Sequence, residues 1–360
     1  LAIVIHPAAR INFLPLDNLY LICHVVAGGS TLFGSNGIMG EIDKMTNIRA
    51  FRLIASILIG FTLVLSLSVR AEERRPVVVG YLAAFKGLDL SIARTDLAAF
   101  THFNLSFANP DAAGRFVDKG KMTCMGDETG ANLSVAALRG TVARLQASGA
   151  KVLISTAGGV IPGCSGDWKA LLAPERRAAT VAALVALVDT LGLDGVDIDI
   201  EGKLLTEIDR AGDYTPFIAA LSDAMKARGK LLTCATASYE GGMIPVSSIP
   251  YFDLVNVMSY DAIGPSWGGP GGEHSSYAMA ERDLDLWLAR GVARERLILG
   301  VPFYGYGFGG AKANWSYREL AAAHGINATK ADVIGDRCAD CRYITHNSPT
   351  TIEKKARLAA

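Results

Sequence analysis

The stretch Leu193-Asp194-Gly195-Val196-Asp197-Ile198-Asp199-Ile200-Glu201 decides how the rest of the chain is interpreted. Successive side chains of a β-strand point to opposite faces, so its apolar residues share one face and its acidic residues the other. The acidic face carries Asp197, Asp199 and Glu201, about 6.6 Å apart along the strand. The apolar face is typical of a buried strand covered by helices. A solvated face of an exposed strand is the alternative, and it leaves the apolar side unexplained.

The three carboxylates predict acid–base chemistry. Ionised carboxylates at this spacing repel one another, so at least one should hold a proton near neutral pH. A carboxyl that stays protonated is what general acid catalysis requires. A second interpretation is a metal-dependent hydrolase, in which Asp197, Asp199 and Glu201 are oxygen ligands for Mg²⁺ or Ca²⁺.

Apolar runs that are typical of strands alternate with helical patterns on both sides of this stretch. The other strands are predicted at 77–81, 101–108, 151–156, 231–237, 252–260 and 296–301. Helices are predicted near 91–100, 135–149, 181–191, 215–229 (capped by Thr215 before Pro216), 277–290 and 350–360. Polar or irregular segments are expected over 109–132 and after Phe308.

This alternation predicts an α/β fold with a parallel sheet, either a doubly wound open sheet or a (β/α)8 TIM barrel. No G-x-G-x-x-G follows the first strand, and the acidic residues lie at the carboxyl end of a strand, so we favour the barrel. Only seven strands are found. We therefore expect a barrel truncated before strand 8, with two sheet edges exposed.

The amino-terminal region is predicted to be removed from the mature protein. Arg49 and Arg52 precede an apolar run over 53–69, so residues 45–71 are predicted to be a secretory signal peptide. An uncleaved membrane anchor is the alternative, at the short limit for a spanning helix. Residues 1–44 precede Met45 and are predicted to be non-native upstream sequence. The catalytic domain would then span 72–360 and be secreted, extracellular or periplasmic.

Charge and cysteine content narrow the class of protein. Lys+Arg and Asp+Glu are equal at 35 each, which gives no electrostatic argument for nucleic acid or an anionic membrane. In an exported chain we expect disulfides Cys124–Cys164 and Cys338–Cys341, and we expect Cys234 to be a buried free thiol. A zinc site is the alternative, but no second Cys/His pair has suitable spacing.

The acidic stretch resembles the D-G-x-D-x-D-x-E motif of glycoside hydrolase family 18, the chitinases and their relatives, and the resemblance extends over about 77–360. Met258-Ser259-Tyr260-Asp261 is similar to the family's M-x-Y-D, and 299–305 is similar to its L-G-x-P-x-Y-G. Thr156-Ala157-Gly158-Gly159 departs from the family's S-x-G-G but keeps a hydroxyl. Only about 40 residues separate Phe308 from the last predicted helix, which is too short for the α/β domain that some chitinases insert there. In this respect the chain resembles a bacterial type without a large insertion domain.

The resemblance implies retaining, substrate-assisted hydrolysis of β-1,4-N-acetylglucosaminide bonds in chitin or chitooligosaccharides, without a metal or other cofactor. Glu201 would be the general acid and base, Asp199 would orient the 2-acetamido group, Asp197 would tune Asp199, and Tyr260 would donate to the acetamido oxygen. Substrate-binding residues are predicted at Tyr81, Phe107, Met258, Asp261, Tyr304 and Trp267. Trp267 lies in a Gly/Pro-rich loop over 264–272, with His274 expected to be exposed nearby.

Two other functions remain open at this point. One is a carbohydrate-binding, chitinase-like lectin, although such proteins typically lose the acid that Glu201 supplies here. The other is an endo-β-N-acetylglucosaminidase acting on glycoprotein glycans. The expected partner is a polysaccharide or oligosaccharide that contains N-acetylglucosamine, with no nucleic acid and no stable membrane association after signal removal. The protein is expected to be a monomer.

Overall fold

The computed structural model describes residues 22–26 and 76–360. The predicted signal peptide, 45–71, lies outside the described residues, as does most of the segment 1–44. Among the described residues, no helix combines the length and the hydropathy that crossing a bilayer requires.

Seven parallel strands form the centre of the fold, as the sequence predicts. Their bounds are Val78–Ala83 (β2), His102–Ala108 (β3), Lys151–Ala157 (β7), Gly195–Asp199 (β8), Leu231–Thr236 (β9), Leu254–Val257 (β10) and Leu297–Pro302 (β11). They pair in sequence order into a curled sheet, of the kind found in a TIM barrel. The carboxyl ends of all seven strands therefore lie at the same end of the barrel, and the acidic residues lie toward that end.

The two edges of this sheet are paired, contrary to the expectation of exposed edges. Strand β1 (Ile22–Val26) lies between β11 and β2 and pairs antiparallel with both, which closes the ring. The periodicity of the sequence predicts neither that β1 pairs with these edges nor that it runs antiparallel to them. Any extended segment can form hydrogen bonds with the backbone groups of a free sheet edge.

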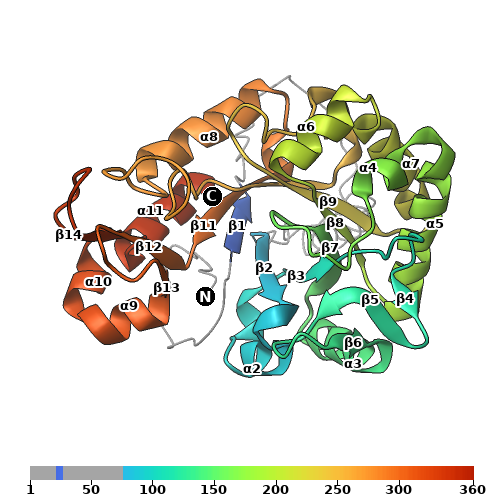
Figure 1. The fold of residues 1–360 in the computed structure, drawn as a ribbon, viewed down its shortest axis with the longest axis horizontal. Helices are drawn as coiled ribbons and strands as arrows, with labels where there is room; N and C mark the ends of the chain where they lie inside the picture. Colours follow the sequence, from blue (N-terminus) through green and yellow to red (C-terminus); the bar gives the residue numbers. More distant parts are fainter. Residues whose placement is uncertain (1–21, 27–75) are drawn as a thin grey trace, which may run out of the picture. The chain divides into compact units, whose positions relative to one another are not determined.

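Helices cover the outer face of the strands (Figure 1). Their bounds are Leu88–Ala93 (α2), Val135–Gln146 (α3), Trp168–Leu172 (α4), Pro174–Leu191 (α5), Gly202–Arg210 (α6), Tyr214–Lys226 (α7), Tyr277–Ala289 (α8) and Pro349–Ala359 (α11). Helix α3 packs on β7, α5 on β8, α7 on β9, and α8 and α11 on β11. Helix α7 begins one residue before the predicted cap, with Asp213 at the N-cap position. Pro216 then lies in the first turn of the helix. The backbone N–H groups of that turn have no partner within the helix, so the N–H that proline lacks is not missed.

The polar segment 109–132 is not a loop. It contains Val117–Asp118 (β4), Lys121–Gly126 (β5) and, at its end, Asn132–Ser134 (β6), which form a three-stranded antiparallel sheet. Only part of β5 is buried, at Met122, Cys124 and Met125. Short strands with so few buried residues have the composition of a loop, which is why the sequence did not predict them.

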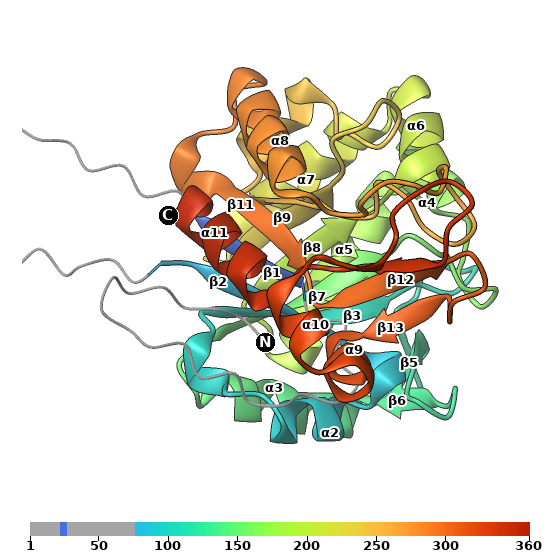
Figure 2. The same ribbon diagram turned by 90° about the vertical axis from the view of Figure 1, so that its left-hand side faces the viewer.

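The segment after Phe308 is not irregular either. Tyr304–Phe308 (β12), Asn314–Ser316 (β13), Val333–Gly335 (β14) and Tyr343–Thr345 (β15) form an antiparallel sheet in the order β13-β12-β15-β14. Tyr317–His324 (α9) and Ile326–Lys330 (α10) connect β13 to β14. Figure 2 shows β12 and β13 with the helices α9 and α10, and α10 lies next to α11. The strand β12 has five residues and the other three strands have three residues each, too few for a periodic pattern to reveal them.

Both predicted disulfides are present, Cys124–Cys164 and Cys338–Cys341, and Cys234 is a buried free thiol. The first bond joins β5 to the segment that follows β7, across 40 residues of sequence. The second closes a short turn between β14 and β15, where the two cysteines are three positions apart. The two bonds therefore differ mainly in how strongly they restrict the unfolded chain.

We predict that the two disulfides contribute unequally to stability. Loop-closure entropy assigns about 4 kcal/mol to a 40-residue loop and about 1.5 kcal/mol to a three-residue loop. Urea denaturation of Cys124→Ser/Cys164→Ser should show the larger loss, with Cys338→Ser/Cys341→Ser as the matched control. Equal losses would contradict this ranking.

Candidate active site

The inner face of β8 carries the two aspartates of the acidic stretch. Asp197 and Asp199 are buried inside the ring of strands, while Val196 and Ile198 pack in the core beneath the helices. Gly195 precedes them, and a Cβ there would overlap the backbone carbonyl of Leu231. Glycine at this position therefore lets β9 approach closely enough to pair with β8.

Asp194 has a structural role. Its carboxylate accepts hydrogen bonds from the Val152 backbone N–H and the Gln146 side chain, both at 2.9 Å, and faces Lys151 Nζ at 3.4 Å. Burial acts to raise the pKa of Asp194, but these donors outweigh it and hold the pKa below its ordinary value. Asp194 thus ties the start of β8 to β7, away from the carboxyl ends of the strands.

Asp197 is surrounded by four neutral donors from four other strands. Its Oδ2 accepts from Tyr81 Oη at 2.9 Å and Ser155 Oγ at 2.7 Å. Its Oδ1 accepts from Thr233 Oγ1 at 2.6 Å and Asn256 Nδ2 at 3.3 Å. The register of the sheet creates this arrangement, because Ser155 and Thr233 pair with Asp197 on its two sides. Burial raises the pKa of Asp197, and the four hydrogen bonds oppose that rise.

Asp199 and Glu201 form a hydrogen-bonded carboxyl pair. Asp199 is buried, and burial followed by the charges of Glu201 and Asp197 raises its pKa well above the ordinary value. Glu201 is partly exposed and is the N-cap residue of α6. Burial raises the pKa of Glu201 to about 7; the charge of Asp261 adds to the rise, and the hydrogen bond from Asp199 opposes it. The pair therefore holds at least one proton near neutral pH.

Tyr260 presents an unused hydroxyl beside this pair. The side chain is buried, and among residues 76–360 its hydroxyl has no hydrogen-bond partner. Burial, then the charge of Asp261, raises the pKa of Tyr260 well above its ordinary value, so the hydroxyl stays a donor. A buried hydroxyl without a partner is costly in a folded protein, and an acceptor on a bound ligand would remove that cost.

Asp261 is held by two side chains and has a left-handed backbone, with φ of 62°. Its Oδ1 accepts from Tyr304 Oη at 2.7 Å and lies 3.5 Å from His274 Nδ1. His274 is fully buried, so the expectation that it is exposed is wrong. It packs against the rings of Tyr304 and Tyr306, and burial lowers its pKa. A polar loop residue looks exposed in the sequence unless its aromatic neighbours from β12 are known.

The predicted substrate-binding residues separate into two groups by exposure. Tyr81 and Tyr304 are buried. The Tyr81 hydroxyl donates a hydrogen bond to Asp197, and the Tyr304 hydroxyl donates one to Asp261. The others reach the surface: Phe107, Met258, Asp261 and Trp267. Trp267 is 44% exposed, donates from Nε1 to the Asp261 carbonyl at 2.9 Å, and meets the Tyr306 ring edge-on at 5.3 Å.

Sequence reasoning missed the three polar partners of Asp197, namely Ser155, Thr233 and Asn256. Each is a polar residue in a strand that is mostly apolar, and that is the one feature of the sequence that could have revealed them. The third-strand hydroxyl that was expected to matter, Thr156, instead donates to the Asp197 backbone carbonyl at 3.3 Å.

The metal-binding interpretation of the acidic stretch finds little support in this geometry. Asp197 already accepts four hydrogen bonds, and Asp199 is paired with Glu201. Within the part of the chain that the structure describes, no three His, Cys, Asp or Glu side chains form a group that could hold a metal ion. What remains is a pair of carboxyls sharing a proton beside the Tyr260 hydroxyl, which has no partner among the described residues. Such an arrangement is suited to general acid–base chemistry.

A barrel with such a carboxyl pair at the ends of its strands defines a class of acid–base enzyme site, and comparison with known proteins places it in a family. The model of the glycosyl hydrolases family 18 matches residues 77–360, so this chain belongs to that family. The class V chitinase CHIT5b of Medicago truncatula is 32% identical over 189 residues, which cover 46% of this chain and 48% of the relative. The chain therefore spans about half the length of that curated relative.

Solved structures share the fold. The GH18 chitinase ChiB from the chitin utilization locus of Flavobacterium johnsoniae has a TM-score of 0.64 at 30% identity, covering 78% of this chain and 83% of that one. A class V chitinase from Nicotiana tobaccum, solved in complex with NAG4, has a TM-score of 0.63 at 20% identity, covering 78% and 89%. At that lower identity the likeness concerns the fold alone.

We predict that Glu201→Gln stabilises the protein at high pH only. Because the pKa of Glu201 is raised from 4.5 to about 7 in the folded state, wild-type stability should fall as pH rises through this window. The amide cannot ionise, so the variant should equal wild type at pH 4 and exceed it by about 1–3 kcal/mol at pH 8. Urea denaturation at both pH values measures the difference.

The control is Glu207→Gln, because the pKa of Glu207 is lowered by its hydrogen bond from Lys169. That variant should gain nothing at pH 8. A stability difference between wild type and Glu201→Gln that stays constant from pH 4 to pH 8 would contradict the raised pKa.

Proposed function

We propose that this chain hydrolyses β-1,4-N-acetylglucosaminide bonds in chitin or chitooligosaccharides, with retention and with participation of the substrate's own 2-acetamido group. The observation that carries the proposal is the Asp199–Glu201 pair, in which burial raises the pKa of Glu201 to about 7. A carboxyl with that pKa can donate a proton to a glycosidic oxygen and later take one back. Membership of family 18 supports the same chemistry.

The first step breaks the glycosidic bond. Glu201 gives its proton to the glycosidic oxygen as the C1–O bond breaks, and the leaving sugar departs as an alcohol. The acetamido carbonyl oxygen bonds to C1 from the opposite face, so the intermediate is an oxazolinium ion. Tyr260, whose hydroxyl lacks a partner among the described residues, donates to that oxygen and aligns it. Asp199 accepts the acetamido N–H and offsets the positive charge.

The second step restores the enzyme. Glu201, now ionised, takes a proton from water as the water oxygen bonds to C1 and opens the oxazolinium ring. Two inversions at C1 give a product with the starting configuration. Asp197 remains surrounded by neutral donors throughout. Its negative charge beside Asp199 is one of the causes that raise the pKa of Asp199, and in this way it tunes the residue that contacts the substrate.

The substrate proposal is supported by relatives and by a partly exposed aromatic side chain that is hydrogen-bonded to the Asp261 backbone. The Nicotiana structure was solved with NAG4, and a domain of an Ostrinia furnacalis chitinase with a longer N-acetylglucosamine oligomer. In this chain Trp267 offers a partly exposed indole, a surface on which a sugar ring can stack. We also propose that the mature protein is secreted, because both disulfides need an oxidising compartment to persist.

We predict that the protein hydrolyses a 4-methylumbelliferyl β-di-N-acetylchitobioside. The rate should fall as pH rises through about 7, because Glu201 must be protonated to act as the acid. Glu201→Gln should lose about 10²–10⁴-fold in kcat while retaining binding, as removal of a general acid does. Fluorescence release against pH measures both effects, and EDTA should leave the rate unchanged.

The matched control is the corresponding cellobioside, which carries a 2-hydroxyl in place of the acetamido group and cannot form the oxazolinium ion. It should not be hydrolysed. Turnover that survives Glu201→Gln would overturn the acid assignment. Sugar binding without any turnover in wild type would point to a lectin instead.

We predict that Tyr260→Phe lowers kcat by about 10- to 100-fold with a smaller change in KM. The hydroxyl should contribute most when the acetamido oxygen attacks C1, as donors to developing charge do. Stability should not fall, because the deleted hydroxyl has no partner among the described residues. A loss confined to KM would show that Tyr260 binds the substrate without assisting the reaction.

A further inference from the structure

Asn109 is a fully buried polar residue directly after β3, and both polar groups of its side chain have partners. Its backbone N–H donates to the Cys124 carbonyl at 3.0 Å, and its carbonyl lies 3.5 Å from Thr123 Oγ1, whose shorter bond goes to the Arg115 carbonyl at 2.6 Å. Its side-chain Nδ2 donates to the Ala157 carbonyl at 3.1 Å, and its Oδ1 accepts from Trp168 Nε1 at 2.8 Å. A longer contact from Ser165 Oγ, 3.4 Å, also reaches Oδ1.

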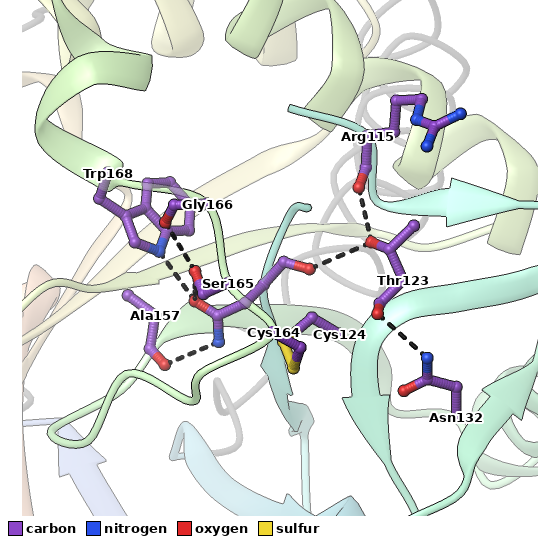
Figure 3. The surroundings of a disulfide bond; sticks show 10 residues. Arg115, Thr123, Cys124, Asn132, Ala157, Cys164, Ser165, Gly166 and Trp168 are labelled. Carbon is purple, nitrogen blue, oxygen red and sulfur yellow. Dashed lines mark hydrogen bonds between the residues drawn. A yellow bond between two sulfur atoms is a disulfide. The ribbon is translucent and has the colours of Figure 1, made fainter. Parts of the chain in front are cut away.

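The orientation of this amide follows from its partners. An indole N–H can only donate and a backbone carbonyl can only accept, so Oδ1 must face Trp168 and Nδ2 must face Ala157. Figure 3 shows Ala157, Ser165 and Trp168 to one side of the Cys124–Cys164 disulfide and Thr123 to the other. Asn109 therefore bridges the segment after β7 and strand β5, which the disulfide also joins.

The carbonyl that Asn109 holds belongs to a strained residue. Ala157 has φ of 68°, in the left-handed region that is unfavourable for a residue with a Cβ. The next residue, Gly158, donates from its backbone N–H to the Asp199 carbonyl at 2.9 Å. Such a conformation persists only where the surroundings enforce it. The hydrogen bond from the buried Asn109 amide to the Ala157 carbonyl is one of the contacts that do so.

The strained turn brings residues 157–159 between a predicted substrate-binding ring and the predicted acid. A Cβ on Gly158 would lie 2.9 Å from the Phe107 ring, so the backbone there touches that ring. A Cβ on Gly159 would lie 3.0 Å from Glu201 Oε1. The backbone of this segment thus covers part of the Glu201 carboxyl.

We propose that Asn109 is a positioning residue of the active site, whose side-chain amide holds residues 157–159 against Glu201 and so limits the access of water to that carboxyl. The inference rests on the proposed function for its effect on activity. It concerns a residue that does not touch the reacting atoms and that acts through Ala157.

The expected consequence follows from the cause of the Glu201 shift. Burial is the largest cause that raises the pKa of Glu201 to about 7. If residues 157–159 move away, water reaches the carboxylate and favours its ionised form. Weakening the Asn109 bond should therefore lower the pH at which Glu201 loses its proton, whereas a merely structural residue would lower stability and leave that pH unchanged.

The test compares Asn109→Leu and Asn109→Ser with Trp168→Phe. Both Asn109 variants lose the donor to Ala157, whereas Trp168→Phe removes only the donor to Oδ1 and keeps the Ala157 bond. The basic limb of kcat/KM on the chitobioside should move to lower pH by about half to one unit in the Asn109 variants, a loss of roughly three- to tenfold at pH 8. Trp168→Phe should keep the wild-type limb.

A second readout needs no turnover. The pH at which Glu201→Gln begins to stabilise the protein reports the Glu201 titration, and it should move in the same direction when Asn109 is replaced in both backgrounds. Absence of wild-type turnover would overturn the proposed function, while this stability comparison still decides the role of Asn109. An unmoved midpoint in folded Asn109 variants, or an equal shift in Trp168→Phe, would overturn the inference.

Gly159→Ala examines the same segment without altering Asn109. Its added methyl group would meet Glu201 Oε1, so either the segment or the carboxyl must shift. The titration midpoint should change in this variant as well. If it stays at the wild-type pH, residues 157–159 do not control the surroundings of Glu201, and the inference fails even where the Asn109 variants do not fold.

Discussion

The structure depends on how two buried carboxyl groups of one strand, Asp197 and Asp199, can lie next to the partly exposed carboxyl of Glu201. Moving ionised carboxylates out of water is costly, and their mutual repulsion adds to that cost. The fold meets the problem in two ways. Asp197 receives four neutral donors, whose hydrogen bonds oppose the rise in its pKa that burial causes, whereas Asp199 and Glu201 share a proton. This difference in surroundings assigns different chemical roles to residues that look equivalent in the sequence.

The two backbone positions that shape this site are conformationally strained. Among the described residues, only three that are not glycine have a positive φ. Two of them belong to the site: Ala157 lies two residues before Gly159, which approaches Glu201, and the charge of Asp261 acts on Glu201. Each is restrained by a side chain from a distant part of the chain, and Asp261 also by a neighbouring loop residue. Asn109 holds the Ala157 carbonyl, while Tyr304 and Trp267 bond to Asp261. Local strain close to reacting groups, stabilised by the surrounding packing, is a common feature of active sites.

The sequence predicts what is encoded locally. The alternation in 193–201 indicates a buried strand with an acidic face, and the structure confirms all seven strands of the parallel sheet. The surroundings of that face depend on register, which brings Ser155 and Thr233 beside Asp197 from strands about 40 residues away. No local pattern contains that information. The burial of His274 likewise depends on rings from β12, a strand in a segment expected to be irregular.

Support for the two proposed donors comes from opposite sides of the fold. Glu201 is covered from the β3 and β7 side through Asn109 and Ala157. Tyr260 follows Ser259, whose carbonyl accepts from Ser275 Oγ at 2.7 Å, and Ser275 in turn accepts hydrogen bonds from Lys355 on α11 at its hydroxyl and its carbonyl.

Lys355 is completely buried, and burial lowers its pKa to about 7. Its third hydrogen bond goes to Asn347 Oδ1 at 2.9 Å, and Asn347 donates back to the Ser275 carbonyl, so the ammonium is enclosed by neutral acceptors. A hydrophobic residue of similar length would fill the same space, yet it would leave the Ser275 hydroxyl and Asn347 Oδ1 without this buried donor. The buried lysine therefore links the segment that carries Tyr260 to the helix α11, through Ser275 and Ser259.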